Sequence, residues 1–335
     1  MTNRPGQGEA LAPPERRSAS RAGIEWPTWI IIVLCHGAWA AVTLAHDALP
    51  MWIFIPFAAY LVTLHSSIQH EAIHGHPTRW RRVNEALVYF PLGLLVPYRR
   101  FRTLHLRHHR DERLTDPYDD PESWYVCPDQ WAQHSRWLRL VKSVNATLAG
   151  RLLAGPLLAA IGLLRADAAR IAAGDRAIAR AWSHHAAGLV PVVIWLELVC
   201  GVSIVIYALC VAYPAMSLLL LRSYAEHRAA GDPNHRTAII EASPLFGLLF
   251  LNNNLHYVHH VHPRAAWYRL PAMYRGARAE YLSGNAGYGY AGYGALLRRC
   301  LFRPHDTITH PRERLQLDQR PVKRGYAPRV EGSHS

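Results

Sequence analysis

The sequence contains few cysteines and few charged residues. Its five cysteines show no C-x-x-C spacing, and three of them fall in apolar runs, which excludes a disulfide framework and a thiolate metal site. Only 18% of the 335 residues are charged, whereas 50% are hydrophobic. Residues 1–25 lack an apolar core, so they indicate a disordered tail and not a cleaved signal peptide. The length allows one large domain.

The positive charge is unevenly distributed. Lys and Arg outnumber Asp and Glu by 37 to 24, and arginines are concentrated in residues 15–21, 79–113 and 298–324. These regions flank apolar segments and lack the interleaved aromatic residues of a nucleic-acid-binding face. We therefore expect the partner to be a membrane and not a nucleic acid.

Long apolar segments predict four membrane spans. The first contains no Asp, Glu, Lys or Arg over 19 positions, and as a helix it would be roughly 28 Å long, the thickness of a bilayer core. The apolar run 186–221 is too long for one helix, and Gly201 can turn the chain within it. The expected spans are residues 28–46, 50–68, 186–201 and 204–222. Two shorter apolar segments, 86–98 and 152–164, are expected not to span.

The predicted fold is an all-α integral membrane protein with four transmembrane helices and a cytoplasmic helical cap. Both termini and the arginine-rich loops then lie on one side, as the positive-inside rule requires of the cytoplasm. The expected division of the chain is a disordered tail over 1–25, a membrane domain over 26–302 and a polar tail over 303–335.

Histidine is abundant, with 21 residues in the chain. Residues 70–74 read HEAIH, an H-E-x-x-H motif that in zinc proteases supplies two metal ligands and a general base. Residues 105–109 read HLRHH and residues 256–260 read HYVHH. Each of these two places imidazoles at i, i+3 and i+4 on one face of a helix. The candidate metal ligands are His70, His74, His105, His108, His109, His256, His259 and His260.

These eight histidines exceed what one tetrahedral zinc binds, but they suffice for two octahedral or five-coordinate irons. Two expected spans separate the second cluster from the third, so all three clusters emerge on the same side of the membrane. The sequence therefore predicts that they converge on one metal site.

The order H-x3-H, H-x2-H-H, H-x2-H-H among four spans resembles the membrane fatty acid desaturase superfamily, which includes desaturases, hydroxylases and beta-carotene ketolases. The resemblance covers roughly residues 28–300. It implies two non-haem irons that use O2 to cleave an unactivated C–H bond in a lipid chain, with electrons from an external ferredoxin or cytochrome. Fatty acyl desaturation is the expected reaction, and fatty acyl or carotenoid hydroxylation or ketolation is the alternative.

The resemblance also adds residues to the site. The family usually has a histidine before the third box, which His227 matches, and an asparagine near the metal, for which Asn252, Asn253 and Asn254 are candidates. The sequence HHVHPRAAWYRLP at residues 259–271 is similar to the ketolases and favours a bacterial branch. We therefore expect a bacterial inner-membrane enzyme with a cytoplasmic active site.

Metal-binding histidines need hydrogen-bond acceptors for their second ring nitrogens. Glu71 and Glu226 each stand next to an expected ligand. Further carboxylates follow the second box directly: Asp111, Glu112, Asp116, Asp119, Asp120 and Glu122. The residues expected to support the ligands in this way are Glu71, Asp116, Asp120, Glu226 and Asn253.

Two other functions fit parts of the sequence. An intramembrane zinc protease would use HEAIH, but it would need an Asp or Glu ligand from another span and leaves two histidine boxes unexplained. A metal store or transporter would place its ligands at mid-membrane and not beyond the ends of the spans. Glu197 lies inside an expected span, where a carboxylate is expected to face a substrate channel or a neighbouring helix.

Overall fold

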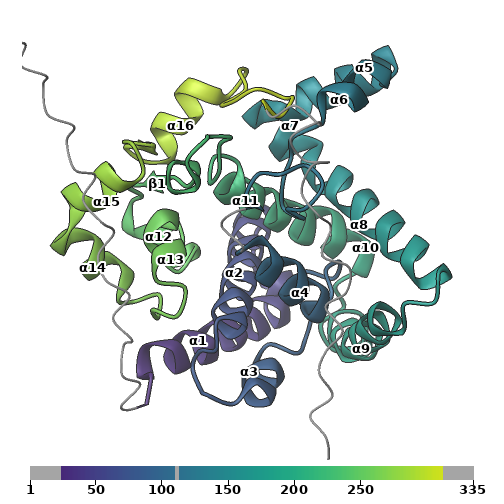
Figure 1. Cartoon of the computed structure of the whole chain (residues 1–335). Helices are drawn as coiled ribbons and strands as arrows, with labels where there is room; N and C mark the ends of the chain where they lie inside the picture. Colours follow the sequence, from purple (N-terminus) through teal and green to yellow (C-terminus); the bar gives the residue numbers. More distant parts are fainter. Residues whose placement is uncertain (1–23, 110–112, 312–335) are drawn as a thin grey trace, which may run out of the picture.

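The computed structural model describes residues 24–109 and 113–311 and is mostly helical (Figure 1). Asp111, Glu112 and most of both expected tails lie outside the described residues. Four helical segments are long and apolar enough to cross a membrane, which confirms the predicted all-α fold with four candidate spans. They are α1 (Trp26–Leu44), α2 (Met51–Ile73), α9 with η3 (Arg176–Val193 and Ile194–Cys200), and α10, η4 and α11 (Ile204–Tyr207, Ala208–Ala212 and Tyr213–Ser223).

The break between the third and fourth spans falls at Gly201. Pro191 lies inside α9, and the helix continues after it as the π-helical segment η3, as expected where proline removes a backbone hydrogen bond. Gly201 adopts φ 75°, a left-handed conformation that glycine allows at a helix end. Glu197 then accepts a hydrogen bond from the N–H of Ile204 at 2.6 Å. This carboxylate therefore caps the start of the fourth span.

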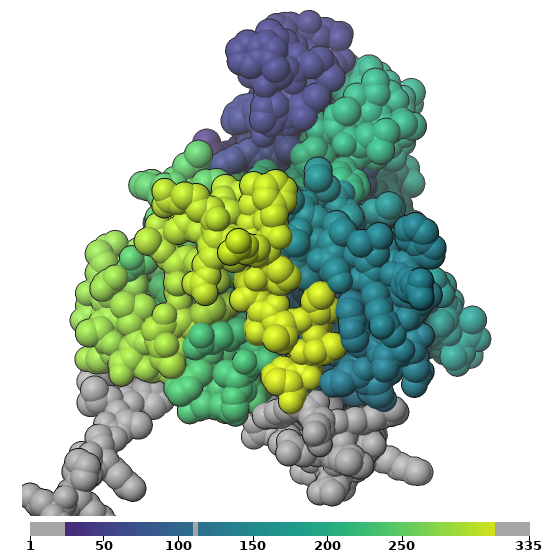
Figure 2. All heavy atoms as spheres, turned by 90° about the horizontal axis from the view of Figure 1, so that it is seen from above, coloured from purple at the N-terminus to yellow at the C-terminus, as the bar shows by residue number. Residues whose placement is uncertain are grey.

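The two pairs of spans form one antiparallel bundle. A Cβ atom placed on Gly201 would lie 4.0 Å from His46, so the turns that end the two hairpins are neighbours. The Trp39 indole donates a hydrogen bond to the Tyr207 hydroxyl at 2.9 Å, which ties the first span to the fourth. Figure 2 shows the purple N-terminal hairpin and the teal-green segment near residue 200 projecting together from one side.

The outer surface of this bundle is apolar. Large apolar side chains with about half or more of their surface exposed include Val33, Leu198, Val205 and Leu209. Contiguous exposed apolar surface of this kind is unfavourable in water but is expected against lipid. The opposite ends of the spans, where α2 and α11 finish, carry the remaining helices as a cap.

The cap is built from short helices and one two-stranded parallel ladder, in which Ile239 pairs with Gly289. A Cβ atom at Gly289 would lie 2.7 Å from the Ile239 carbonyl oxygen, so this close approach requires glycine. The turn between α1 and α2, at the other end of the bundle, contains η1 (His46–Ala48). The other elements are α3 (Arg81–Leu87), α4 (Tyr98–His108), α5 (Pro128–Gln133), α6 (Arg136–Ala146), α7 (Leu148–Leu153), α8 (Gly155–Ala172), η5 (Pro233–Arg236), β1 (Ile239–Ile240), α12 (Pro244–Leu249), α13 (His256–Val261), α14 (Leu270–Gly276), α15 (Arg278–Gly284), β2 (Gly289–Tyr290) and α16 (Tyr293–Cys300).

Residues 303–311, expected to begin a polar tail, pack against the cap. Val126 donates a backbone hydrogen bond to Ile308 at 3.0 Å, and His310 donates one back to Val126 at 2.9 Å. The His310 side chain is buried. The folded part of the chain therefore extends past residue 302.

Helix α4, which carries the second histidine box, is anchored by a buried ion pair. Arg100 on α4 donates two hydrogen bonds of 2.7 Å to Asp167 on α8. The Trp182 indole donates a third hydrogen bond to the same carboxylate. Both charged side chains are almost fully buried, so each depends on the other for solvation.

Replacing Asp167 with alanine is expected to destabilise the protein by about 3–5 kcal/mol, because it leaves the Arg100 guanidinium buried without its counter-charge. Thermal unfolding of the purified protein in a neutral detergent measures this loss. Asp119→Ala is the control, since its partners Arg107 and Arg113 are both well exposed and such pairs contribute less than about 1 kcal/mol. Equal shifts in the two variants would contradict the proposed anchor.

Candidate metal centre

The first histidine pair lies where α2 leaves the bundle. His70 is in the last turn of α2, and His74 directly follows its final residue, Ile73. Gly75 then adopts φ 91° and turns the chain away. The i, i+4 spacing puts both rings on one side of the helix, with their centroids 4.7 Å apart. The helix end therefore presents two imidazoles toward the cap.

The second box forms the end of α4. His105 and His108 are buried, and His109 directly follows the helix. At 100° per residue, His105 and His109 lie about 40° apart around the helix axis, whereas His108 and His109 lie about 100° apart. The three rings of this box therefore point in two directions.

The third box forms the short helix α13, in which His256, His259 and His260 are all buried. The helix is held to β1, because the Tyr257 N–H donates a hydrogen bond to the carbonyl of Ala238 at 3.0 Å. His227 follows α11 and is fixed by a β-bridge to Thr237. The Tyr288 hydroxyl donates to the Ala225 carbonyl at 2.8 Å and supports the same loop.

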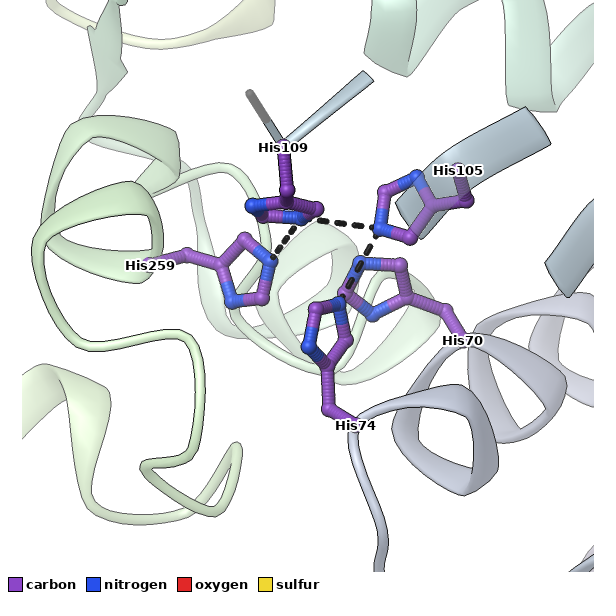
Figure 3. A group of neighbouring side chains, drawn as sticks. All are labelled: His70, His74, His105, His109 and His259. Carbon is purple, nitrogen blue, oxygen red and sulfur yellow. Dashed lines mark hydrogen bonds between the residues drawn. The ribbon is translucent and has the colours of Figure 1, made fainter. Parts of the chain in front are cut away.

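These nine histidines assemble into two groups. Within each group, one nitrogen per ring lies within 4.8 Å of every other. Figure 3 shows the first group, in which rings from α2, α4 and α13 point toward a common centre. The first group is His70, His74, His105, His109 and His259, and the second is His108, His227, His256 and His260.

The nitrogens in each group are closely spaced. In the first group, His105 Nε2 lies 3.0 Å from the Nε2 atoms of both His74 and His109. In the second, His227 Nε2 lies 2.9 Å from His108 Nε2 and 3.0 Å from His256 Nε2. Metal–nitrogen bonds of about 2.1 Å place neighbouring nitrogens roughly 3.0 Å apart at right angles but roughly 3.4 Å apart at the tetrahedral angle. Each group therefore brings ring nitrogens to separations that ligands of a single metal ion adopt.

Hydrogen bonds on the outer side of the rings explain why these nitrogens face one another. His108 Nδ1 lies 2.8 Å from Asp120, and His105 Nδ1 lies 3.0 Å from Glu122. A carboxylate only accepts, so Nδ1 carries the proton and Nε2 keeps its lone pair. Lone pairs aimed at each other across 3 Å repel unless a cation lies between them. Both groups therefore fit a metal ion.

The protonation of four of the nine rings agrees with metal binding. Burial lowers the pKa of His109, His227, His256 and His259, so these imidazoles are neutral, the form that binds metal. Burial also lowers the pKa of His108, but the carboxylates of Glu122 and Asp120 outweigh it and raise that pKa to about 9. Metal binding therefore has to displace the Nε2 proton of His108. In addition, His70 Nε2 is buried without a hydrogen-bond partner among the described residues.

Comparison with known families decides the identity of this arrangement. The fatty acid desaturase family matches residues 47–292, well over half of the chain. The chain belongs to the fatty acid desaturase family. No individually curated protein matches it. It is thus a membrane oxidoreductase of the lipid desaturase and hydroxylase type, in a family that typically uses iron.

The residues expected to form hydrogen bonds to the metal ligands do not all contact those histidines in the structure. Asp120 contacts His108, as described above, and Asn253 Oδ1 lies 3.1 Å from His256 Nδ1. Glu226 lies 3.6 Å from the same nitrogen but 3.1 Å from the Arg222 guanidinium, its closer partner. Of the five expected residues, Asp120 and Asn253 are therefore the two whose side chains form hydrogen bonds to candidate ligands.

The Glu71 and Asp116 carboxylates accept hydrogen bonds from backbone N–H groups. Glu71 accepts a hydrogen bond from the Trp267 N–H at 3.1 Å and stays 3.7 Å from His70 Nδ1. Asp116 accepts from the N–H groups of Tyr118 and Asp119 in a turn. Glu71 thus ties the first box to the segment after the third box, and Asp116 shapes the acidic loop.

Several polar residues near the site were not singled out by sequence. Glu122 was only one carboxylate of the acidic run, and Thr237, whose hydroxyl lies 3.3 Å from His227 Nδ1, has no sequence signal. Histidines next to the boxes take other partners. His76 Nδ1 lies 2.8 Å from a Glu25 oxygen, and His262 Nε2 lies 3.0 Å from the Tyr281 hydroxyl.

Proposed function

We propose that this protein is an O2-dependent di-iron oxygenase whose reaction is fatty acyl desaturation. The observation that carries the proposal is the pair of groups, in which imidazoles aim their ring nitrogens at two centres. The two groups would hold one iron each. The iron pair, when bound, supplies dioxygen activation for cleavage of an unactivated C–H bond in the lipid chain.

The protein side chains keep this centre in place. Asp120, Glu122 and Asn253 accept the Nδ1–H protons of His108, His105 and His256, which fixes the ring tautomers and directs Nε2 inward. Glu71, through the Trp267 N–H, fixes the first and third boxes relative to each other. Glu71 is therefore engaged in the fold, unlike the free general base of a zinc protease, and five imidazoles in the first group exceed the three ligands of catalytic zinc.

A recess next to the first box supports a lipid-chain substrate. It lies between α2, the segment 91–96 and the fourth span. Ser66 and Gln69 line it within one turn of His70, and Ala212, Met216 and Leu219 form its apolar wall. An acyl chain entering from the bilayer would meet apolar groups here and end near the histidines.

Electron supply and orientation are further parts of the proposal. The electrons would come from an external ferredoxin or cytochrome. Arginine-rich sequence flanks the histidine end of the bundle, which supports a cytoplasmic position of the active site in a bacterial inner membrane. The membrane domain would begin near residue 26.

The product of the reaction tests the proposal. The protein is expressed in a bacterial host and the total lipids are compared by mass spectrometry under ¹⁸O2, with His108→Ala as the inactive control. A lipid that has lost two hydrogens and gained no oxygen supports desaturation. A product that carries one ¹⁸O atom indicates hydroxylation or ketolation, the alternative that the ketolase-like residues 259–271 favour. Lipids identical to those of the control would contradict the proposal.

A further inference from the structure

A second polar pocket lies apart from the histidines, where α6 and α7 meet the segment that follows α16 (Figure 1). Its wall is continuous with the cap, because Trp124 stands two residues after Glu122. The pocket adjoins Tyr224, the first residue after the fourth span. The side chains that define it are Trp124, Lys142, Asn145, Arg151, His305 and Asp306.

Arg151 is the central group of this pocket. It is only 4% exposed, and its guanidinium carbon lies 3.7 Å from the centre of the Trp124 ring. Its Nε donates to the Asn145 carbonyl at 3.1 Å. Within residues 24–109 and 113–311, no carboxylate forms an ion pair with Arg151. A buried guanidinium without a counter-ion is costly, since stacking on an aromatic ring replaces only part of its hydration.

A second cation lies beside it without a carboxylate. Burial and the Arg151 charge lower the pKa of Lys142, and in the part of the chain that the structure describes Lys142 also has no ion pair. The pocket contains one acid, Asp306, whose oxygens already accept from the Tyr125 hydroxyl and from the N–H groups of Ala229 and Thr307. Two neighbouring cations therefore face a cavity that contains one carboxylate, so positive charge is in excess there.

Two uncharged polar atoms in the pocket are also unsatisfied. His305 Nδ1 and Asn145 Oδ1 are buried and have no hydrogen-bond partner among the described residues. The Nδ1 of a neutral His305 imidazole can donate to an oxygen ligand, whereas Asn145 Oδ1 is an acceptor. The site thus offers the donors of Arg151, Lys142 and His305 and excess positive charge in one pocket.

The position of the pocket indicates where its ligand comes from. Arg151 also contacts the ring of Tyr224, 5.5 Å from its centre, so the pocket is level with the end of the fourth span. The outer face of α6 carries exposed Trp137, Leu140 and Val144. An amphipathic helix of this kind lies at the depth of lipid headgroups.

We infer that this pocket binds a phosphate group, held by Arg151, Lys142 and His305 at the membrane surface. The same chemistry occurs in a phospholipid headgroup and in a water-soluble phosphate ester. The binding does not depend on the iron assignment, because no histidine of the two groups lines the pocket.

Equilibrium binding to the full-length protein in neutral detergent and phosphate-free buffer tests the inference. The ligands are dioleoyl phosphatidylglycerol, coenzyme A as a soluble phosphate ester, and dioleoylglycerol, which has the same chains as the lipid but no phosphate. Lys142→Gln and Arg151→Gln are each expected to weaken binding of the phosphate ligand about tenfold or more. Arg136→Gln, which removes an exposed charge from the same helix, is expected to leave it unchanged.

The pattern of affinities separates the two sources. Variant-sensitive binding of the phospholipid alone assigns a headgroup, and variant-sensitive binding of coenzyme A assigns a soluble phosphate ester.

The stability of the variants is the second readout. Because Arg151 lacks a counter-ion, Arg151→Gln should unfold at or above the wild-type temperature without ligand. Lys142 is only half-buried, so its variant remains informative if Arg151→Gln does not fold. Phosphate ligands that bind Lys142→Gln and the wild type equally, or dioleoylglycerol that binds as tightly as the phospholipid, would overturn the inference.

Discussion

His108→Ala is expected to reduce the metal content from about two ions per chain to one or fewer and to abolish turnover. His108 supplies one of only four imidazoles in the second group, and its Nε2 lies 2.9 Å from that of His227. Loss of a direct ligand should exceed the roughly 10–100-fold effect of losing a residue that only supports a ligand. Elemental analysis of detergent-purified protein measures the ions, and product formation measures turnover.

His46→Ala is the control for this experiment. His46 lies at the opposite end of the bundle, beside Gly201, so its replacement should leave both metals in place. A protein with one zinc that persists in His108→Ala and disappears in His74→Ala would contradict the two-iron assignment. That result would favour the zinc-protease interpretation of HEAIH instead.

Asp120→Asn is expected to lower turnover by about 10–100-fold and to weaken metal retention. The Asp120 carboxylate accepts from His108 Nδ1 at 2.8 Å and from the N–H of Thr115 at 2.9 Å. An amide carries no charge to hold the imidazole proton, so the tautomer that directs Nε2 to the metal becomes less favourable. Turnover and metal loss during dialysis against a chelator measure the two effects.

Asp116→Asn is a matched comparison, since Asp116 lies in the same loop and its Oδ1 accepts from the backbone N–H groups of Tyr118 and Asp119. We expect its turnover to stay within a few-fold of the wild type. If both variants lose activity equally, Asp120 acts by folding the acidic loop and not by orienting His108.

Much of this site could be predicted from local sequence because helix geometry is local. The i, i+4 spacing of His70 and His74 requires both rings on one side of α2, and the apolar segments alone predict four spans, which the structure confirms. The family assignment followed from the same motifs and is confirmed as well.

The division of the ligand candidates between two centres could not be predicted in this way. His108 and His109 are adjacent in sequence, yet they belong to different groups. Which centre each ring reaches depends on how α2, α4 and α13 cross in space, and those crossings are set by packing over the whole cap.

Which carboxylates form hydrogen bonds to the ligand histidines could not be predicted from sequence either. Glu226 stands next to His227 but pairs most closely with Arg222, and Glu71 stands next to His70 but holds Trp267. Sequence by itself determined the membrane class, the family and the histidines that can bind metal, because these depend on composition and on spacing within single helices. Only the tertiary structure decided which centre each histidine faces and which acid supports it, because hydrogen bonds form between atoms that folding brings within about 3 Å.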